Sequence, residues 1–365
     1  MLHGCRLLPV ESVNSVLDTS PYPGEHCSQQ RTLFTKRRNH GSDVVLGAGP
    51  IGATTARHFA DRGDRVTVVT RSGTGPRHPG IDRVAIVISA GSLDEVAAGA
   101  SVIVNAVNLP YAQWATGWPP IHRAIMAAAE SSGAVLAVAG NLYLYPAGSS
   151  TMTARTPIDP PTRKGAVRAR MWADLVQAHE AGRIRTLELR ASDYVGAQVV
   201  STEGAHAGPR LVDPVLQGKR ASVVGDPDAP HTWTAVDDIA RTIVTLAQDE
   251  RAWGRAWHVP SAPARSIRQL ADDVAKAAGA PGARLSRIPR PALRAMGMVQ
   301  PQLREIVEML YQFDEPFIAG HEETTEAFGL TPTPWAQTVD AIVAAAQARI
   351  SGAGATAAVG ATQSR

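Results

Sequence analysis

The stretch "VVLGAGPIGATTARHFADRGDRVTVVTRSG" (residues 44–73) carries the clearest fold signal of the sequence. It joins a short apolar run to a glycine-rich turn, a helical pattern that Gly63 ends, and the β-branched run "RVTVVT". In the turn, Gly47, Gly49 and Gly52 follow the spacing G-x-G-x-x-G. Between a strand and a helix, this spacing predicts a phosphate-binding turn. The first glycine allows the tight turn, the second admits a pyrophosphate, and the third lets the helix pack on the strand.

The residues of this turn predict a dinucleotide ligand. A helix that begins here presents free N–H groups and the positive end of its dipole to phosphates. We therefore expect five residues of the turn to bind the cofactor: Gly47, Gly49, Pro50, Ile51 and Gly52. The alternative interpretation is a glycine-rich turn that binds nothing.

The end of the second apolar run predicts which dinucleotide binds. An NAD site usually has Asp or Glu there, whereas this chain has Thr70 followed by Arg71. A guanidinium can bind a 2′-phosphate through two hydrogen bonds, so we expect NADP to be preferred over NAD. The alternative is that Arg71 is a solvated surface residue.

Strand-like and helix-like patterns alternate from residue 42 to 197 and predict a nucleotide-binding domain. Short apolar runs such as "RVAIVIS" (83–89), "ASVIVNAV" (100–107), "AVLAVAG" (134–140) and "IRTLELR" (184–190) are typical of buried parallel strands. Helical patterns such as "PIHRAIMAAAESSG" (120–133) lie between them. The pattern indicates an α/β fold: a Rossmann-type, doubly wound parallel sheet.

The alternation loosens after residue 197. We expect residues 198–350 to form a smaller C-terminal substrate lobe interleaved with the main sheet, with helices near 266–278, 301–311 and 335–349. Residues 1–41 show no period and are predicted to be a disordered extension. The small and polar tail 351–365 is predicted to be disordered as well.

The composition argues against several classes of protein. The 365 residues are 44% hydrophobic and carry a net charge of +3, with Lys and Arg scattered, which argues against a nucleic-acid partner. No apolar run reaches the ~18 residues of a membrane span, and the N-terminus lacks the pattern of a signal peptide. Both cysteines, Cys5 and Cys27, lie in the opening segment. That usage excludes core disulfides and cysteine-built metal sites and favours the cytoplasm. The dispersed histidines predict no metal site.

Three further stretches carry a family resemblance. "GNLYLYP" (140–146), "RASDYVG" (190–196) and "HTWTAVDDIAR" (231–241) follow the expected strands. With the glycine turn, they make residues 42–345 similar to the extended short-chain dehydrogenase/reductase superfamily, the NAD-dependent epimerase/dehydratase-like proteins. The resemblance implies hydride transfer, served by a Ser, a Tyr and a Lys, the last two spaced Y-x-x-x-K.

The chain departs from this pattern at all three positions and resembles the atypical members of the superfamily. Asn141 stands at the Ser position, and Lys164 and Arg168 stand at the Tyr and Lys positions. Asn141 can donate a hydrogen bond to a carbonyl, and Tyr143 can supply the missing phenol. Lys164 is an acid if desolvation lowers its pKa, or a solvent-facing residue at a helix start. We expect Asn141, Tyr143 and Lys164 to be the catalytic residues.

Two interpretations stay open for several residues. We expect Arg168 either to bind the nicotinamide ribose or to lie on a solvated helix face. Asn105, with Asn108 and Tyr111, lies near the nicotinamide or in an ordinary loop. Tyr145 supplies a phenol or packs in the fold. The acids of "DDIA" (237–240) are explained by helix capping and the helix dipole.

These observations together predict an NAD(P)-dependent oxidoreductase with an atypical active site. Its substrate is expected to be a small organic carbonyl or alcohol, or a sugar derivative. The alternative is a catalytically inactive NADP-binding sensor or regulatory protein, because all three standard catalytic residues are replaced. The resemblance also implies a homodimer built on the helix expected over 165–182.

Overall fold

The computed structural model describes residues 42–149, 151–201, 205–299 and 301–362. The predicted disorder of residues 1–41 lies outside these ranges.

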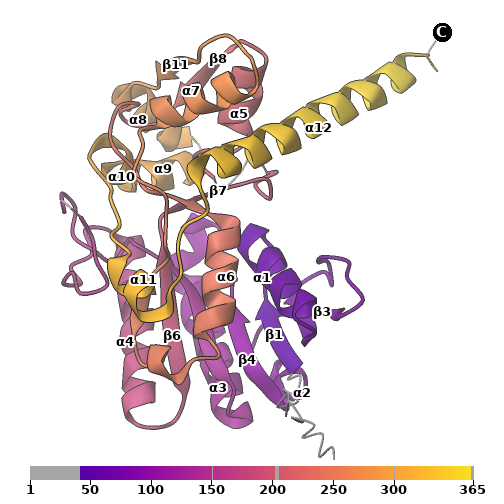
Figure 1. Cartoon of the computed structure of the whole chain (residues 1–365). Coiled ribbons are helices and arrows are strands. Elements are labelled where there is room, and N and C mark those ends of the chain that lie inside the picture. Colours follow the sequence, from indigo (N-terminus) through magenta and orange to yellow (C-terminus); the bar gives the residue numbers. More distant parts are fainter. Residues whose placement is uncertain (1–41, 150, 202–204, 300, 363–365) are drawn as a thin grey trace, which may run out of the picture. The chain divides into compact units, whose positions relative to one another are not determined.

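A parallel seven-stranded sheet forms the centre of the described fold (Figure 1). The strand order is β10-β6-β5-β4-β1-β2-β3, so the chain winds outward in both directions from β1 and β4. The strands are β1 (Ser42–Leu46), β2 (Arg65–Thr70), β3 (Ile81–Ala85), β4 (Ala100–Asn105), β5 (Val135–Asn141), β6 (Arg185–Ala191) and β10 (Ala256–His258). The prediction of a Rossmann-type doubly wound sheet is confirmed.

Helices cover both faces of this sheet. One face carries α1 (Pro50–Asp61) and α6 (Val236–Leu246), which lie side by side in Figure 1, and the other carries α2 (Asp94–Ala97), α3 (Trp114–Ser132) and α4 (Arg163–Glu180). In β1, Val45 packs toward α1 and α6, whereas Val44 and Leu46 pack toward the opposite core. Because successive side chains of a strand point to opposite faces, an unbroken apolar run is what a doubly covered strand requires. Each fully buried Val or Leu contributes about 1.5–3 kcal/mol.

The segment after β6 builds a second layer and returns to the sheet. A separate core joins α5 (Pro209–Leu216), α7 (Ile267–Ala277) and the first part of α12 (Trp335–Thr362). The remaining elements are η1 (Tyr111–Gln113), β7 (Asp193–Val195), β8 (Arg220–Val223), β9 (Trp233–Ala235), η2 (Glu250–Ala252), β11 (Arg284–Arg287), α8 (Arg290–Val299), α9 (Pro301–Glu308), α10 (Tyr311–Asp314) and α11 (Glu322–Phe328). Because α6 and β10 belong to the sheet body, this lobe is threaded through the first domain.

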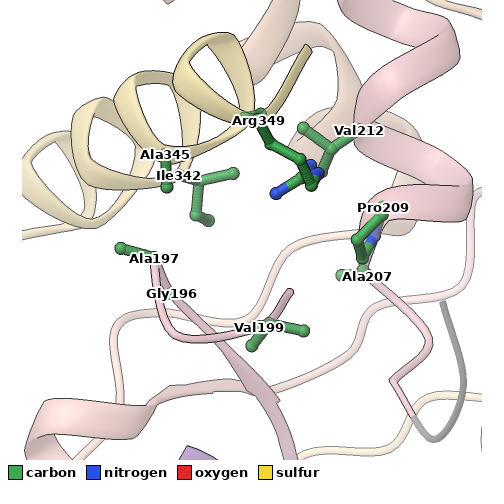
Figure 2. A pocket seen from close by; sticks show the side chains of 11 residues that line it. Gly196, Ala197, Val199, Ala207, Pro209, Val212, Ile342, Ala345 and Arg349 are labelled. Atoms are coloured by element: carbon green, nitrogen blue, oxygen red, sulfur yellow. The ribbon is translucent and has the colours of Figure 1, made fainter. Parts of the chain in front are cut away.

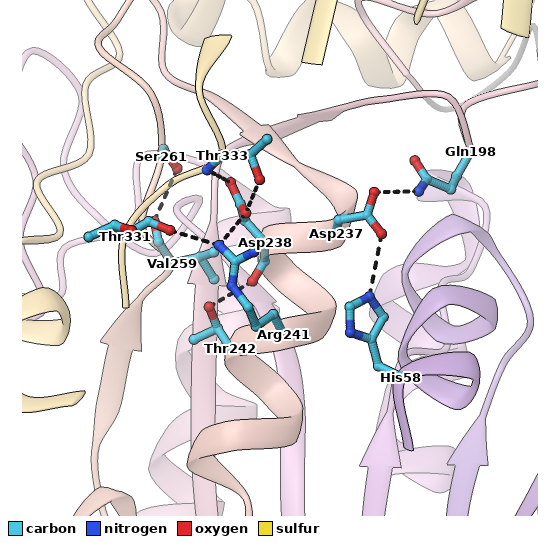
Figure 3. A network of polar contacts seen from close by, with 10 residues as sticks. All are labelled: His58, Gln198, Asp237, Asp238, Arg241, Thr242, Val259, Ser261, Thr331 and Thr333. Carbon is cyan, nitrogen blue, oxygen red and sulfur yellow. Dashed lines mark hydrogen bonds and ion pairs between the residues drawn. The ribbon is translucent and has the colours of Figure 1, made fainter. Parts of the chain in front are cut away.

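The acids at the start of α6 join segments that are distant in sequence (Figure 3). Asp238 is buried and accepts hydrogen bonds from the backbone N–H and the hydroxyl of Thr333, at 2.8 and 2.6 Å, and from Arg241 at 2.6 Å. Asp237 accepts a hydrogen bond from Gln198 at 2.7 Å and contacts His58 of α1 at 3.4 Å. The capping interpretation is therefore incomplete: these carboxylates tether the segment before α12 and the loop after β7 to the sheet body.

Three predicted elements differ from the structure. The strand expected at 83–89 is β3, which begins at Ile81 and is largely exposed, because it is the edge strand with one neighbour. Helix α3 begins at Trp114 rather than Pro120, because buried Trp114 and Trp118 extend its apolar face. Of the tail predicted to be disordered, residues 351–362 continue helix α12, which runs to Thr362.

A buried acid in β1 makes the stability depend on pH. Asp43 is 1% exposed, and its Oδ1 has no hydrogen-bond partner among the described residues. Burial, reinforced by the charge of Asp64, raises the pKa of Asp43 to about 7. A free aspartic acid has a pKa of about 3.9, so the folded state holds the proton more tightly. Asp43 therefore destabilises the fold progressively as the pH rises from about 4 through 7.

We predict that Asp43→Asn stabilises the protein more at pH 8 than at pH 5, by about 2 kcal/mol. Urea unfolding of both proteins at the two pH values measures the difference. The control Asp82→Asn changes a side chain that is 63% exposed and should show no such trend. A stability difference for Asp43→Asn that stays constant with pH would contradict this interpretation.

Candidate active site

The glycine turn between β1 and α1 is fixed by close backbone contacts. Gly47 has a φ of +97°, and a Cβ there would lie 2.7 Å from the carbonyl oxygen of Ala106. A Cβ on Gly52 would lie 2.1 Å from the oxygen of Gly47. The Gly47 N–H donates to Val69 O at 2.9 Å, which joins the turn to β2. Both positions therefore require glycine for packing, whether or not a ligand binds.

Gly49 differs, because a Cβ there would meet nothing within 4 Å. It is the N-cap of α1 and makes no side-chain cap hydrogen bond, and Pro50 is the first residue of the helix. Ile51 packs against the sheet core and fixes the start of the helix. The N-terminal end of α1 thus faces open space beside a glycine, which fits the approach of a pyrophosphate.

Arg71 lies at the end of β2, on an exposed turn. The turn is held by the hydroxyl of Thr70, which donates to Thr74 O at 2.9 Å, and by a 2.9 Å hydrogen bond between Ser72 and Thr74. Within the described ranges, Arg71 has no hydrogen bond or ion pair. Its guanidinium is therefore available to an anion.

Two asparagines shape the ends of the central strands. Asn105 ends β4 and accepts a hydrogen bond from the backbone N–H of Val107 at 3.2 Å. Asn141 ends β5 and accepts one from the N–H of Tyr143, also at 3.2 Å. Each side-chain carbonyl stabilises the backbone turn that follows its strand. The amide NH₂ group of each asparagine is left to donate elsewhere. These exits lie at the carboxyl edge of the sheet, where ligands bind in such folds.

A pair of tyrosines meets at this edge. The hydroxyls of Tyr111 and Tyr143 share a 2.7 Å hydrogen bond, and the ring of Trp114 stacks on Tyr143. Burial raises the pKa of Tyr111 to about 12. Burial also raises the pKa of Tyr143 well above its usual range, and the neighbouring Tyr111 and Asp193 add to this effect. Both phenols are therefore protonated at neutral pH.

Lys164 lies beside the pair, and its solvent-facing interpretation is wrong. Its side chain is 2% exposed, and its Nζ lies 2.5 Å from Glu305 and in contact with Glu308. Glu308 also accepts a 2.5 Å hydrogen bond from the backbone N–H of Arg163. Both carboxylates come from α9, so the ammonium holds α9 onto the start of α4 and lies over the Tyr111 ring.

Arg168 is also buried, so the solvated-face interpretation is wrong for this residue. It is 5% exposed and lies between Trp114 and Trp118, its Cζ 4.7 and 4.8 Å from their ring centroids. Burial lowers the pKa of its guanidinium, an effect that Glu188 opposes. Its Nε has no hydrogen-bond partner in the described part of the chain. A buried, unpaired donor on α4 is a candidate contact for a ligand.

Tyr145 packs in the fold. It is 1% exposed, lies 2.8 Å from Nε2 of His258 and accepts a 2.6 Å hydrogen bond from Arg190. Burial, and then the charge of Arg190, lowers the pKa of His258 to about 3. Its Nδ1 faces Gly320 O at 2.9 Å, so the neutral ring donates there and its Nε2 accepts from Tyr145. The Tyr145 hydroxyl therefore donates to His258 and accepts from Arg190, and both partners belong to the fold.

An acidic group that the sequence motifs do not indicate lies near the tyrosine pair. The Asp193 carboxylate, at the start of β7, lies 2.9 Å from Nε2 of His231. Burial raises the pKa of Asp193, but the hydrogen bond and charge of His231 outweigh it, so the pKa lies below the usual value. Burial raises the pKa of Tyr311, and the neighbouring Tyr111, Glu308 and Asp193 add to this effect. Asp193 adds in the same way to the raised pKa values of the tyrosine pair. The stretches "RASDYVG" and "LREIVEML" contain no local pattern that indicates a functional role for Asp193, Glu305 or Glu308. Acidic residues at a strand end or on an amphipathic helix are normally exposed.

The small hollow in Figure 2 lies elsewhere. Loop residues after β7 line it, together with side chains from α5 and α12. Its charged residue, Arg349, pairs with Asp213. Small and aliphatic side chains make up most of the rest, so the hollow offers little chemistry.

No three His, Cys, Asp or Glu side chains of the described ranges gather closely enough to hold a metal ion. No helix in that part of the chain combines the length and apolar character needed to cross a bilayer.

Comparison with known proteins places this geometry in context. The sequence model of the "NAD dependent epimerase/dehydratase family" matches residues 44–259. None of the curated proteins compared with the chain matches its sequence.

Several solved structures share the fold. A double mutant of the dTDP-glucose 4,6-dehydratase DesIV from Streptomyces venezuelae, with NAD and DAU bound, has a TM-score of 0.66 at 17% identity, covering 84% of this chain and 96% of that one. WbmH from Bordetella bronchiseptica with NAD⁺ has a TM-score of 0.63 at 19% identity, covering 84% and 97%. The UDP-N-acetylglucosamine 4-epimerase from Methanobrevibacter ruminantium, in complex with UDP-N-acetylmuramic acid, has a TM-score of 0.70 at 13% identity, covering 85% and 99%.

We predict that Lys164→Met loosens α9, because it leaves Glu305 and Glu308 together without their cation. The expected loss of unfolding free energy is about 2 kcal/mol, less than for a fully buried pair, since the carboxylates are 19% and 26% exposed. Urea unfolding measures this loss, and hydrogen exchange should show faster exchange in α9. Arg170→Met, which removes an 80% exposed partner of Asp174 on the same helix, is the control. Unchanged α9 exchange in Lys164→Met would show that the ammonium does not hold α9.

Proposed function

Because the chain belongs to the NAD dependent epimerase/dehydratase family, we propose that it is an NADP-dependent oxidoreductase with an atypical active site. It reduces the carbonyl group of a small organic molecule or sugar derivative. The observation that carries the proposal is the hydrogen-bonded pair Tyr111–Tyr143 at the carboxyl edge of the sheet that bears the glycine turn. This pair supplies a phenol where the family's usual tyrosine is replaced.

The residues present fit a bound NADP. The open space over Gly49 and the N-terminal end of α1 suit the pyrophosphate, and the exposed Arg71 suits the 2′-phosphate. Asn105 and the unpaired Nε of Arg168 are donors for the nicotinamide half. When bound in its reduced form, the cofactor supplies a hydride.

Tyr143 is the proposed proton donor, and Tyr111 relays a proton to it through their shared hydrogen bond. Asn141, through its free NH₂ group, donates a hydrogen bond to the substrate oxygen. The cation that would otherwise favour a tyrosinate, Lys164, is engaged by Glu305 and Glu308. Both phenols carry their proton at neutral pH, as donation to the substrate oxygen in the proposed reduction requires. Lys164 itself acts as a positioning residue for α9.

A sensor without catalysis is the second candidate function. The observation that favours it is the same Lys164 cluster, because α9 closes over the position of the family's catalytic tyrosine. Tight NADPH binding with no turnover of any aldehyde or ketone would favour the sensor.

Two sequence-based expectations remain proposals. A homodimer built on α4 would use its outward face, where Ala166, Arg170, Ala173 and Gln177 are exposed. Light scattering of the full chain tests it. The cytoplasmic location rests on cysteine usage, and fractionation of the cells that express the protein tests it.

We predict that Arg71→Glu weakens NADPH binding about 10- to 100-fold, because it removes a charged hydrogen-bond donor and adds repulsion. The affinity for NADH should be unchanged. Calorimetric titration measures both dissociation constants. The control Arg77→Glu reverses an exposed charge in the same connection and should have little effect. An equal loss of affinity for both nucleotides, or no loss of affinity for NADPH, would show that Arg71 does not bind the 2′-phosphate.

We predict that Tyr143→Phe lowers kcat about 100-fold without changing the dissociation constant of NADPH. Tyr111→Phe should lower kcat less, because Tyr143 keeps its own hydroxyl. The rates are measured by NADPH oxidation with the best carbonyl compound of an aldehyde and ketone panel. If Tyr143→Phe turns over as fast as the unaltered protein, Tyr143 is not the proton donor.

A further inference from the structure

Helices α8 and α9 line a cavity that the proposed reaction does not use. Its volume is about 370 Å³, which is within the range of ordinary ligand pockets, ~300–1,000 Å³. Five residues line it: Arg294, Gly297 and Met298 of α8, and Arg304 and Val307 of α9. A Cβ on Gly297 would lie 3.1 Å from the backbone of Arg304, so the two helices cross closely at this glycine. The cavity is therefore shaped by two packed helices.

The charge that borders the cavity is positive. Arg294 makes no hydrogen bond or ion pair within the part of the chain that the structure describes. The Nε of Arg304 lies 3.9 Å from one carboxylate oxygen of Glu305, and its side chain is 72% exposed. The other oxygen of Glu305 lies 2.5 Å from the Nζ of Lys164. Two guanidinium groups thus border one cavity, and none of the residues that line it is acidic.

The two arginines that precede Arg294 are arranged differently. Arg287 and Arg290 both donate hydrogen bonds to Asp314, at 2.6 and 2.5 Å, and this carboxylate is 6% exposed. Their charges therefore hold β11 and the start of α8 onto α10. Arg294 lies one turn further along α8, and its guanidinium is available to a partner outside the described chain.

Apolar side chains are concentrated beside these arginines. The described residues expose six large hydrophobic side chains, and three of them, Met296, Met298 and Val299, lie at the end of α8. Met298 is 83% exposed and lines the cavity together with Val307. Exposed apolar patches mark surfaces that another molecule covers, and the flexible thioether of methionine adapts to ligands of different shape.

From this combination we propose that the cavity binds a single-chain amphiphile with an acidic head, an aliphatic carboxylate or phosphate. The acidic head accepts hydrogen bonds from Arg294 and Arg304, because a guanidinium matches the geometry of both anions. The aliphatic chain covers Met298 and Val307. A small hydrophilic anion would leave these side chains in water, and an uncharged chain would leave both arginines without an acceptor.

The test uses the methionine methyl groups as local probes. Protein labelled with ¹³C at these methyl groups is titrated with octanoate, and the variant Met298→Leu assigns the Met298 signal. We expect the Met298 signal to shift and to saturate, whereas the signal of Met152, which is 1% exposed, should not move. Octanol has the same chain without the charge and should bind at least about tenfold more weakly.

The variant Arg294→Gln/Arg304→Gln removes both charges at exposed positions and should weaken octanoate binding at least about tenfold. The matched control is Arg210→Gln/Arg284→Gln, which makes the same change of charge at exposed positions of α5 and β11. We expect the control to bind octanoate as tightly as the unaltered protein.

Three results would overturn the proposal. The first is a Met298 signal that does not move with millimolar octanoate. The second is an equal affinity for octanoate and octanol, or an equal loss in the control variant, because either would show that the two arginines do not bind the head. The third is a response to phosphatidylglycerol vesicles without a response to free octanoate, which would assign the surface to a membrane. The titration needs neither cofactor nor turnover, so its outcome is independent of the proposed function.

Discussion

The close approach of the Gly47–Gly52 turn to the end of β4 is the contact on which the rest of the structure depends. A side chain on Gly47 would collide with Ala106, and one on Gly52 would collide with the turn itself. With glycine at these positions, α1 packs on the sheet and its N-terminal end comes beside the exits of β1 and β4. The same contact that closes the fold therefore brings the expected cofactor turn next to Asn105, which pairs with Leu46.

Burial and charge pairing then determine what this edge can do. The two phenols are desolvated and protonated, and the lysine that could have activated one of them is held by two carboxylates of α9. The proposed proton donation by Tyr143 depends on this arrangement, because both phenols keep their proton at neutral pH.

The sequence allowed much of the fold to be predicted, because apolar runs and glycine spacing are local signals. Edge strand β3 was misplaced because its pattern does not reveal that it has a single neighbour. At the site, Asn141 and Tyr143 could be found from a motif, whereas the surroundings of Lys164 could not. Its partner Glu305 lies 141 positions further along the chain, and in its own helix that residue has the pattern of a solvated face. Burial of Arg168 between two tryptophans is likewise a tertiary effect that no local period indicates.

A calorimetric titration of NADPH and of NADH into the full chain decides whether the turn and Arg71 form the site described. The geometry predicts that NADPH binds at least about tenfold more tightly than NADH, a difference of about 1.4 kcal/mol or more. Equal affinities for NADPH and NADH would show that Arg71 does not contact the 2′-phosphate. If neither nucleotide binds, the glycine turn serves packing alone, and the tyrosine pair has no hydride donor to work with.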